Sequence, residues 1–285
     1  MFSLPLEVQF DVLKCLNFNQ LFSVKQTNCY LLNLINKYEG GLARRKFKEI
    51  SIIKTSSDFN FDKVIDLQSG VFEFTLNDQL KNKWQAAVDK SIPLFLNNFE
   101  YNIIYITEAV KRRTLLLNLP NPPKNIEEMI IARCWLEKLS TFAFEYASFN
   151  ISVFNPEMIN ILFDNDKTIP LRFNSEKANL YSNNNTIETV LKFCLNHLTI
   201  SEILHIDLDK VIITEELTNI SFNILVNEGN KFPKISLSRF KSAKLYDLII
   251  KYIITSRDCS KMVPFIWLFC TSRFKLSERA ENGST

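Results

Sequence analysis

Hydrophobic and polar positions follow two alternating periods over the second half of the chain. Runs with the spacing of an amphipathic helix are followed by short apolar or alternating runs typical of strands. The sequence predicts helices over 156–163, 187–198, 215–228 and 245–256, and strands over 169–173, 203–208, 235–240 and 264–269. The strand starts recur about every thirty residues, which is the spacing of stacked β-α repeat units. We therefore expect a solenoid-like array in this half.

The predicted strands place apolar and polar side chains on opposite faces, so one face of the sheet should meet water. In the strand over 235–240, the inward positions are Ile235, Leu237 and Phe240, and the outward positions are Ser236, Ser238 and Arg239. This arrangement resembles leucine-rich-repeat architecture, although the LxxLxLxxN motif of that family is absent. A globular α/β sheet would give a similar alternation. The absence of a Gly-rich turn and the even length of the units favour the array.

Residues 50–155 carry weaker versions of the same signals. The pattern predicts strands over 71–76 and 101–107, a helix over 81–95 that Pro93 disturbs, and a helix over 127–139 that buries Trp135. Residues 119–123 should form an extended connector, because a residue that precedes proline avoids the α region. We expect these elements to be the first units of the same array.

The N-terminal residues predict three short helices. The first begins at Leu4-Pro5, with proline at its first position and Glu7 in its first turn. The second spans 19–24 with Asn19 as its N-cap. The third begins near Thr27-Asn28 and ends at Gly40-Gly41, and residues 42–47 should form another helical turn. The stripe on the third helix is Leu31, Leu34, Ile35 and Tyr38.

The first of these helices is apolar on two sides. Leu6, Phe10 and Leu13 share one face, whereas the other face consists of Val8, Val12 and Cys15. A module of this size cannot bury both faces in its own thin core. We therefore expect one face to contact a partner.

Three segments resemble the F-box family: Leu4-Pro5-Leu6-Glu7-Val8, Val12-Leu13-x-Cys15-Leu16 and Gln20-Leu21-Phe22-x-Val24. The resemblance implies binding to the Skp-type adaptor of a cullin–RING ubiquitin ligase. Carried over position by position, it assigns nine residues to the adaptor-facing surface or its support: Leu4, Pro5, Leu6, Val8, Val12, Leu13, Leu16, Leu21 and Val24. The expected organisation is an α+β chain, with a three-helix F-box over 1–47 and an α/β repeat domain over 48–285 that recognises a protein substrate.

Composition and charge narrow the function classes. The chain has only 5 glycines among 285 residues, which disfavours Gly-rich phosphate loops. The net charge is +3, and the best basic runs, at 44–48 and 111–113, are short, so we do not expect nucleic-acid binding. Six scattered cysteines and the lack of a signal-like or membrane-spanning stretch predict a cytoplasmic or nuclear protein without membrane contact.

Candidate chemistry is sparse, and we expect neither catalysis, nor a metal, nor a cofactor. Cys194, His197 and His205 form no second ligand pair, and core packing is the favoured interpretation. Asp164-Asn-Asp166 lacks the glycine and distal glutamate of a calcium loop. A cluster of acidic residues near a repeat edge fits either a solvated loop or a contact for a basic target: Asp207, Asp209, Glu215 and Glu216.

Three functional hypotheses follow. The first is a substrate-recognition adaptor that binds a Skp-type adaptor and a cullin scaffold through its F-box and an unknown protein target through its repeats. The second is a solenoid scaffold without a ligase, in which the N-terminal helices cap the array. The third, a hydrolase or transferase, requires a deep pocket with convergent polar groups.

Overall fold

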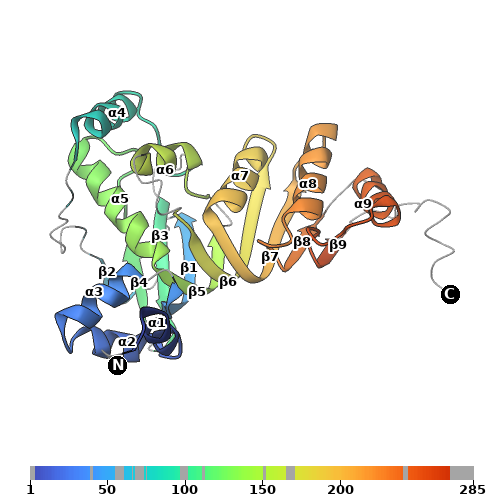
Figure 1. Cartoon of the computed structure of the whole chain (residues 1–285). Helices are drawn as coiled ribbons and strands as arrows, with labels where there is room; N and C mark the ends of the chain where they lie inside the picture. The colour runs from blue at the N-terminus through green and yellow to red at the C-terminus, as the bar shows by residue number, and fades with distance from the viewer. Residues whose placement is uncertain are drawn as a thin grey trace.

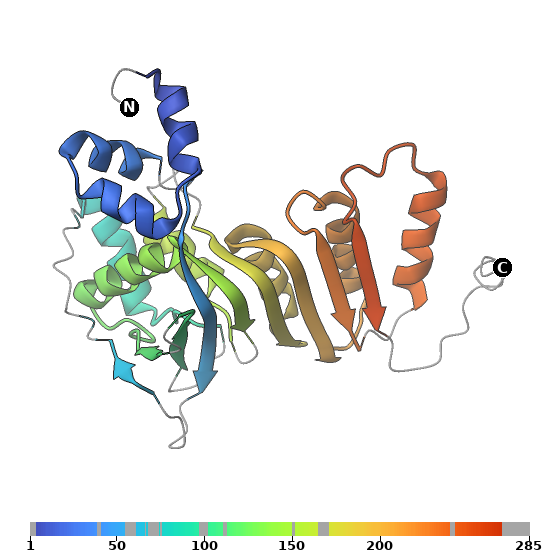
Figure 2. The ribbon, with the colours of Figure 1, turned by 90° about the horizontal axis from the view of Figure 1, so that it is seen from below.

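The computed structural model describes residues 4–38, 41–54, 61–65, 67, 74, 76–96, 102–110, 113–149, 152–164, 171–239 and 243–269 (Figures 1 and 2). Three N-terminal helices lie at one end of a mixed α/β structure. The helices are α1 (Leu6–Lys14), α2 (Phe18–Lys25), α3 (Cys29–Lys37), α4 (Asp78–Asp89), α5 (Ile126–Ser140), α6 (Pro156–Phe163), α7 (Ile187–His197), α8 (Glu215–Asn227) and α9 (Ala243–Thr255).

Within the described ranges, nine strands form one sheet in the order β2-β4-β3-β1-β5-β6-β7-β8-β9. The sheet is mostly parallel. Its strands are β1 (Arg45–Lys54), β2 (Lys63–Val64), β3 (Asn102–Glu108), β4 (Thr114–Leu117), β5 (Phe142–Phe149), β6 (Phe173–Asn183), β7 (Leu198–Lys210), β8 (Lys234–Ser238) and β9 (Phe265–Phe269).

The five strands β5 to β9 are consecutive neighbours, and every pair among them is parallel. The helices α6, α7, α8 and α9 connect them in turn and lie beside one another along one side of the sheet (Figure 1). Burial alternates along β6, because one side of that strand packs under the helices and the other side is partly exposed. The predicted helices and strands of this half are therefore present, but the strand before α7 is shifted. Of the predicted strand 169–173, residues 169–170 lie outside the described part of the chain, residues 171–172 are not in a strand, and β6 begins at Phe173.

The first half of the sheet differs from the expected uniform array. β3 pairs antiparallel with both β1 and β4, so residues 50–155 do not continue the parallel series in chain order. Instead β1 lies between β3 and β5 and joins the two halves. The predicted helix over 81–95 is too long at its C-terminal end, since α4 ends at Asp89. The predicted strand over 71–76 lies mostly outside the described residues.

The prediction of a helical turn over 42–47 is wrong, because β1 begins at Arg45. Phe47, Ile50 and Ile52 are buried in the main core, and this burial fixes the segment as a strand. β5 was also absent from the predicted elements. It follows α5 after a single residue and pairs in parallel with β1 and β6.

Phenylalanine rings form the centre of the main core. The rings of Phe154 and Phe173 stack with centroids 5.0 Å apart, and the ring of Phe193 meets Phe149 edge-to-face at 5.5 Å. All four side chains are almost completely buried. Each such burial contributes about 1.5–3 kcal/mol, which explains why a chain so rich in phenylalanine folds around them.

Candidate functional site

The three N-terminal helices enclose a small core of their own, separate from the core beneath the sheet. Its buried members come from all three helices and from the segment that follows them: Leu13, Leu21, Leu31, Leu34, Ile35 and Leu42. Phe10, Leu16, Val24 and Tyr38 pack against this core and are partly buried. We call this unit, residues 4–42, the helical module.

Side-chain hydrogen bonds fix the helix starts of the helical module. Asn17 forms a capping box with Gln20, in which each side chain accepts a hydrogen bond from the backbone N–H of the other residue. The N-cap of helix α2 is therefore Asn17, two residues earlier than predicted, and the assignment of Asn19 as N-cap is wrong. Asn28 caps α3 by accepting from the N–H of Leu31, in agreement with the predicted start.

Helix α1 is anchored through a polar residue on its inner side. Gln9 is buried, and its Nε2 donates to the carbonyl oxygen of Leu4 over 2.7 Å. The Tyr30 hydroxyl donates to Gln9 Oε1 over 2.8 Å and ties α1 to α3. A Cβ on Gly41 would lie 2.9 Å from the Phe10 ring, so glycine at this position permits the close packing of that ring.

Several apolar side chains of the helical module are exposed, beside the exposed charged side chains Glu7, Asp11 and Lys14. Leu4, Leu6, Val8 and Val12 each expose 40–42% of their area, and Phe22 exposes 53%. Pro5 is exposed beside them, and Cys15 is an exposed free thiol. We call Leu4, Pro5, Leu6, Val8, Val12 and Phe22 the apolar face.

The nine residues assigned by the F-box resemblance thus fall into two groups. Five lie on the apolar face: Leu4, Pro5, Leu6, Val8 and Val12. The other four form or line the small core, with Leu13 and Leu21 fully buried and Leu16 and Val24 partly buried. Leu6 was expected on the inner side with Leu13, but it is exposed. Phe22 belongs to the surface although the resemblance did not assign it; its position next to the buried Leu21 on a short helix is the signal.

The sheet face without helices carries ion pairs between neighbouring strands. Lys46 on β1 lies 2.8 Å from Glu176 on β6 and 3.5 Å from Glu145 on β5. The hydrogen bond to Glu176 and the charges of both carboxylates raise the pKa of Lys46. On the next strands Lys177 pairs with Glu202 at 3.3 Å. Over strands β1, β5, β6 and β7 this face is therefore charged, and it could contact a partner through these groups.

Three residues of the basic run 44–48, namely Arg44, Arg45 and Lys46, form contacts within the fold. Arg44 donates to the carbonyl oxygen of Ser140, and Arg45 lies 3.4 Å from Glu108. Of the acidic cluster, Asp207 and Asp209 both contact Arg239, and Glu215 pairs with Lys244. Of the run 111–113, only Arg113 lies in the described part of the chain. No broad basic patch results from either run in the described residues.

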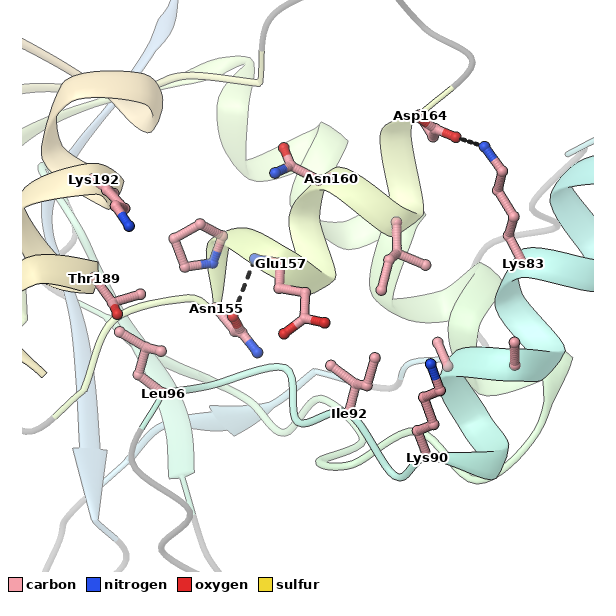
Figure 3. Close-up of a pocket in the computed structure, with 14 residues that line it drawn as sticks. Lys83, Lys90, Ile92, Leu96, Asn155, Glu157, Asn160, Asp164, Thr189 and Lys192 are labelled. Carbon is pink, nitrogen blue, oxygen red and sulfur yellow. Dashed lines mark hydrogen bonds and ion pairs between the residues drawn. The ribbon is translucent and has the colours of Figure 1, made fainter. Parts of the chain in front are cut away.

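A cleft of about 730 Å³ lies on the helical side, between α4, α6 and α7 (Figure 3). Lys83 pairs with Asp164 at one end, while Lys90 and Lys192 line other parts of the cleft. The side chain of Asn155, at the start of α6, forms hydrogen bonds within the fold. It accepts from the N–H of Glu157 and donates to the carbonyl oxygen of Pro93. Asp166, the other carboxylate of the calcium-like motif, lies outside the described residues. The cleft brings together no nucleophile and base.

The residues considered for metal or catalytic chemistry are part of the packing. Cys194 is buried, and burial raises the pKa of its thiol. His197 is buried with Nδ1 3.1 Å from the carbonyl oxygen of Leu171, and burial lowers the pKa of its imidazole. His205 lies 2.8 Å from Ser236 Oγ and also has a pKa lowered by burial. Over the described ranges, no three His, Cys, Asp or Glu side chains are grouped as metal ligands.

The fold and its surfaces define a mixed α/β protein with a nine-stranded, mostly parallel sheet in the described ranges and an N-terminal helical module. Residues 65–209 match the family described as "Domain of unknown function (DUF8381)", and the chain belongs to that family. The match begins after the helical module and ends in β7. No curated protein and no solved structure matches the chain. In the described ranges no helix is both long and apolar enough to cross a membrane.

Proposed function

We propose that this chain is the substrate-recognition adaptor of an SCF-type ubiquitin ligase. In this proposal the helical module acts as an F-box that docks on the Skp-type adaptor, and the remainder holds a protein target. This chain would supply no catalytic group to the ubiquitin transfer. It would raise the local concentration of target lysines near the conjugating enzyme that the cullin scaffold carries.

The observation that carries the proposal is the apolar face of α1. Leu4, Leu6, Val8 and Val12 remain about two-fifths exposed while Leu13 on the same helix is completely buried. A short helix whose inner side is buried and which still exposes several apolar side chains is suited to docking on another protein. The positions of these exposed residues are those for which the F-box resemblance implies adaptor contact.

The consecutive order of β5 to β9 supports a leucine-rich-repeat-like solenoid as the target-binding part. Each added β-α unit would extend the same sheet and leave one sheet face open. That face carries the paired charges of Lys46, Lys177 and Arg239, which suit a polar protein target.

Co-expression of the full chain with an affinity-tagged Skp-type adaptor, followed by purification through the tag, tests the proposal. The wild-type chain should co-purify with the adaptor, whereas Val8→Arg/Val12→Arg should not, because two buried cations would face an apolar surface. Ile212→Arg is the matched control, since Ile212 is an exposed aliphatic residue far from the helical module in the chain. Equal capture of the double variant, or no capture of the wild type, would reject the proposal.

One observation favours a second function, a protein-binding scaffold without a ligase link. The family match over 65–209 lies wholly outside the helical module, so the matched part does not include the segment that resembles an F-box. The helices of the helical module would then cap the fold beside the N-terminal end of β1. A pull-down separates the two functions, because only the ligase adaptor brings a cullin into the eluate.

A further inference from the structure

The two edges of the sheet differ in length and chemistry. One edge is β2, which has two residues and includes Lys63. The other edge is β9, whose five residues, FIWLF, include neither a charge nor a proline. Natural sheets block their edges with short strands, lysine or proline, because a free edge pairs with other strands. β2 is blocked in this way and β9 is not.

Strand β9 also exposes a stripe of aromatic rings. Phe265, Trp267 and Phe269 are 60%, 45% and 54% exposed, while Ile266 and Leu268 between them pack against the main core. Trp267 and Phe269 meet edge-to-face with centroids 6.1 Å apart. Alternate exposed aromatics of this kind stabilise pairing with a further strand through cross-strand contacts.

Among the described residues, the cation beside these rings does not block the edge. Lys234 lies on β8, the inner neighbour, and its Nζ is 4.3 Å from the Trp267 ring centroid and 5.5 Å from that of Phe265. In the described part of the chain, β8 is the one strand that pairs with β9. Among the described residues, no second strand pairs with the outer side of β9, where a further strand could form a ladder.

The order of side chains along β9 is symmetric about Trp267. The residues next to Trp267 are the aliphatic Ile266 and Leu268, and the residues beyond them are Phe265 and Phe269. A two-fold interface requires the same patch on both copies, with residue i facing j and j facing i. Any antiparallel pair of β9 strands meets this condition. When the pair is centred on Trp267, like side chains meet, because Phe265 of each copy faces Phe269 of the other and Ile266 faces Leu268.

We infer that β9 pairs antiparallel with β9 of a second copy of this chain, about a two-fold axis at Trp267. The pairing joins the two sheets edge to edge into one continuous sheet across the dimer. Ile253 and Ile254 of α9 are also exposed, and α9 lies at the same end of the molecule as β9 (Figure 1). The helix layer thus adds apolar surface beside the joined strands. This inference does not rest on the ligase proposal.

A pair of double variants tests both the interface and its register. In Phe265→Lys/Phe269→Lys, antiparallel pairing puts lysine opposite lysine twice, and the dimer dissociation constant should rise about tenfold or more. In Phe265→Lys/Phe269→Glu, the same register puts lysine opposite glutamate twice, so the dimer should persist and weaken as salt is added. Both positions are more than half exposed, so neither variant disturbs the core.

Sedimentation equilibrium of the full chain gives the result directly. The wild type and Val64→Arg, an exposed position on the opposite sheet edge, should form dimers, and the Lys/Lys variant should be shifted toward monomer. A wild-type chain that stays monomeric up to about 100 μM overturns the inference. Such a result is expected if another segment of the chain covers β9. Equal dimerisation of the Lys/Lys variant and the wild type overturns the interface. Equal loss in the Lys/Lys and Lys/Glu variants overturns the antiparallel register.

Discussion

Tyr30 donates its hydroxyl to Gln9, with 2.8 Å between Oη and Oε1, and the same buried amide donates to the carbonyl oxygen of Leu4. Gln9→Leu removes both hydrogen bonds and leaves the Leu4 carbonyl without its donor. We expect a loss of about 1–3 kcal/mol in the free energy of unfolding of the helical module. Tyr30→Phe, which removes one bond, should cost less. Amide hydrogen exchange in α1 measures the effect, and unchanged protection in Gln9→Leu would contradict it.

Two neighbours on α1 should respond oppositely to truncation. Leu13 is fully buried in the small core, and Leu13→Ala should destabilise the helical module by about 2–5 kcal/mol. Val12 is 41% exposed, and Val12→Ala should change its stability by less than about 1 kcal/mol. Urea denaturation of the two variants, followed by exchange in α1 to α3, makes the comparison. An equal cost for both substitutions would show that Val12 is covered by its own chain.

The capping box of α2 can be tested by comparing alanine substitutions at Asn17 and Asn19. Asn17→Ala removes the side-chain acceptor at the start of α2 and should cost about 0.5–2 kcal/mol. Asn19→Ala, two residues later inside the helix, should be nearly neutral because alanine is the better helix former. Circular dichroism during denaturation reports both values. A larger loss for Asn19→Ala would mean that α2 begins where the sequence pattern alone placed it.

Acid should destabilise the fold through His197 and His205. Burial lowers the pKa of His197, so the unfolded chain binds a proton at a higher pH than the folded chain does. The stabilising effect is complete above the unfolded pKa of about 6.5 and is lost as the pH falls from there through the folded pKa. Urea unfolding at about pH 7.5 and about pH 5.5 should give a lower stability at the acidic pH.

The variant that isolates this effect is His197→Asn, which is neutral at both pH values. It should have a smaller stability difference between the two conditions than the wild type. His205, whose pKa is also lowered by burial, contributes in the same direction, so His197→Asn/His205→Asn should reduce the difference further. A wild-type chain that gains stability on acidification within this range would contradict the assignment of neutral buried imidazoles.

The sequence predicted the repeating half well because its elements carry one clear period each. The helix over 156–163 and the strand over 264–269 match α6 and β9 within one residue. Local capping and apolar spacing determine such elements, and both can be read from neighbouring residues. The third helix, with its stripe of Leu31, Leu34 and Ile35, was predicted for the same reason.

The missed strands depend on partners that are distant in the chain. β1 begins with Arg45 and Lys46, which read as a solvated basic run, and only the carboxylates of Glu145 and Glu176 account for Lys46 on the sheet face. The antiparallel position of β3 between β1 and β4 is likewise a long-range choice. Local periodicity carries no information on which strands become neighbours.

The apolar face was half predicted. Val8 and Val12 were placed on the outer side because they recur at a helical interval, and both are exposed. Leu6 shares a helical face with the buried Leu13 by the same rule, yet it is exposed. The polar Gln9 takes the inner position, where the Tyr30 hydroxyl donates to its side-chain oxygen. A hydrophobic period does not register such a hydrogen bond.

The most direct test of the proposed function is a hydrogen-exchange footprint of the full chain with a purified Skp-type adaptor. Our account predicts slower exchange in α1 and α2 on adding the adaptor, with β7 and α8 unchanged. It also predicts that Val8→Arg/Val12→Arg loses this protection while Ile212→Arg keeps it. Exchange in α1 and α2 that is the same with and without a saturating excess of adaptor would contradict the account.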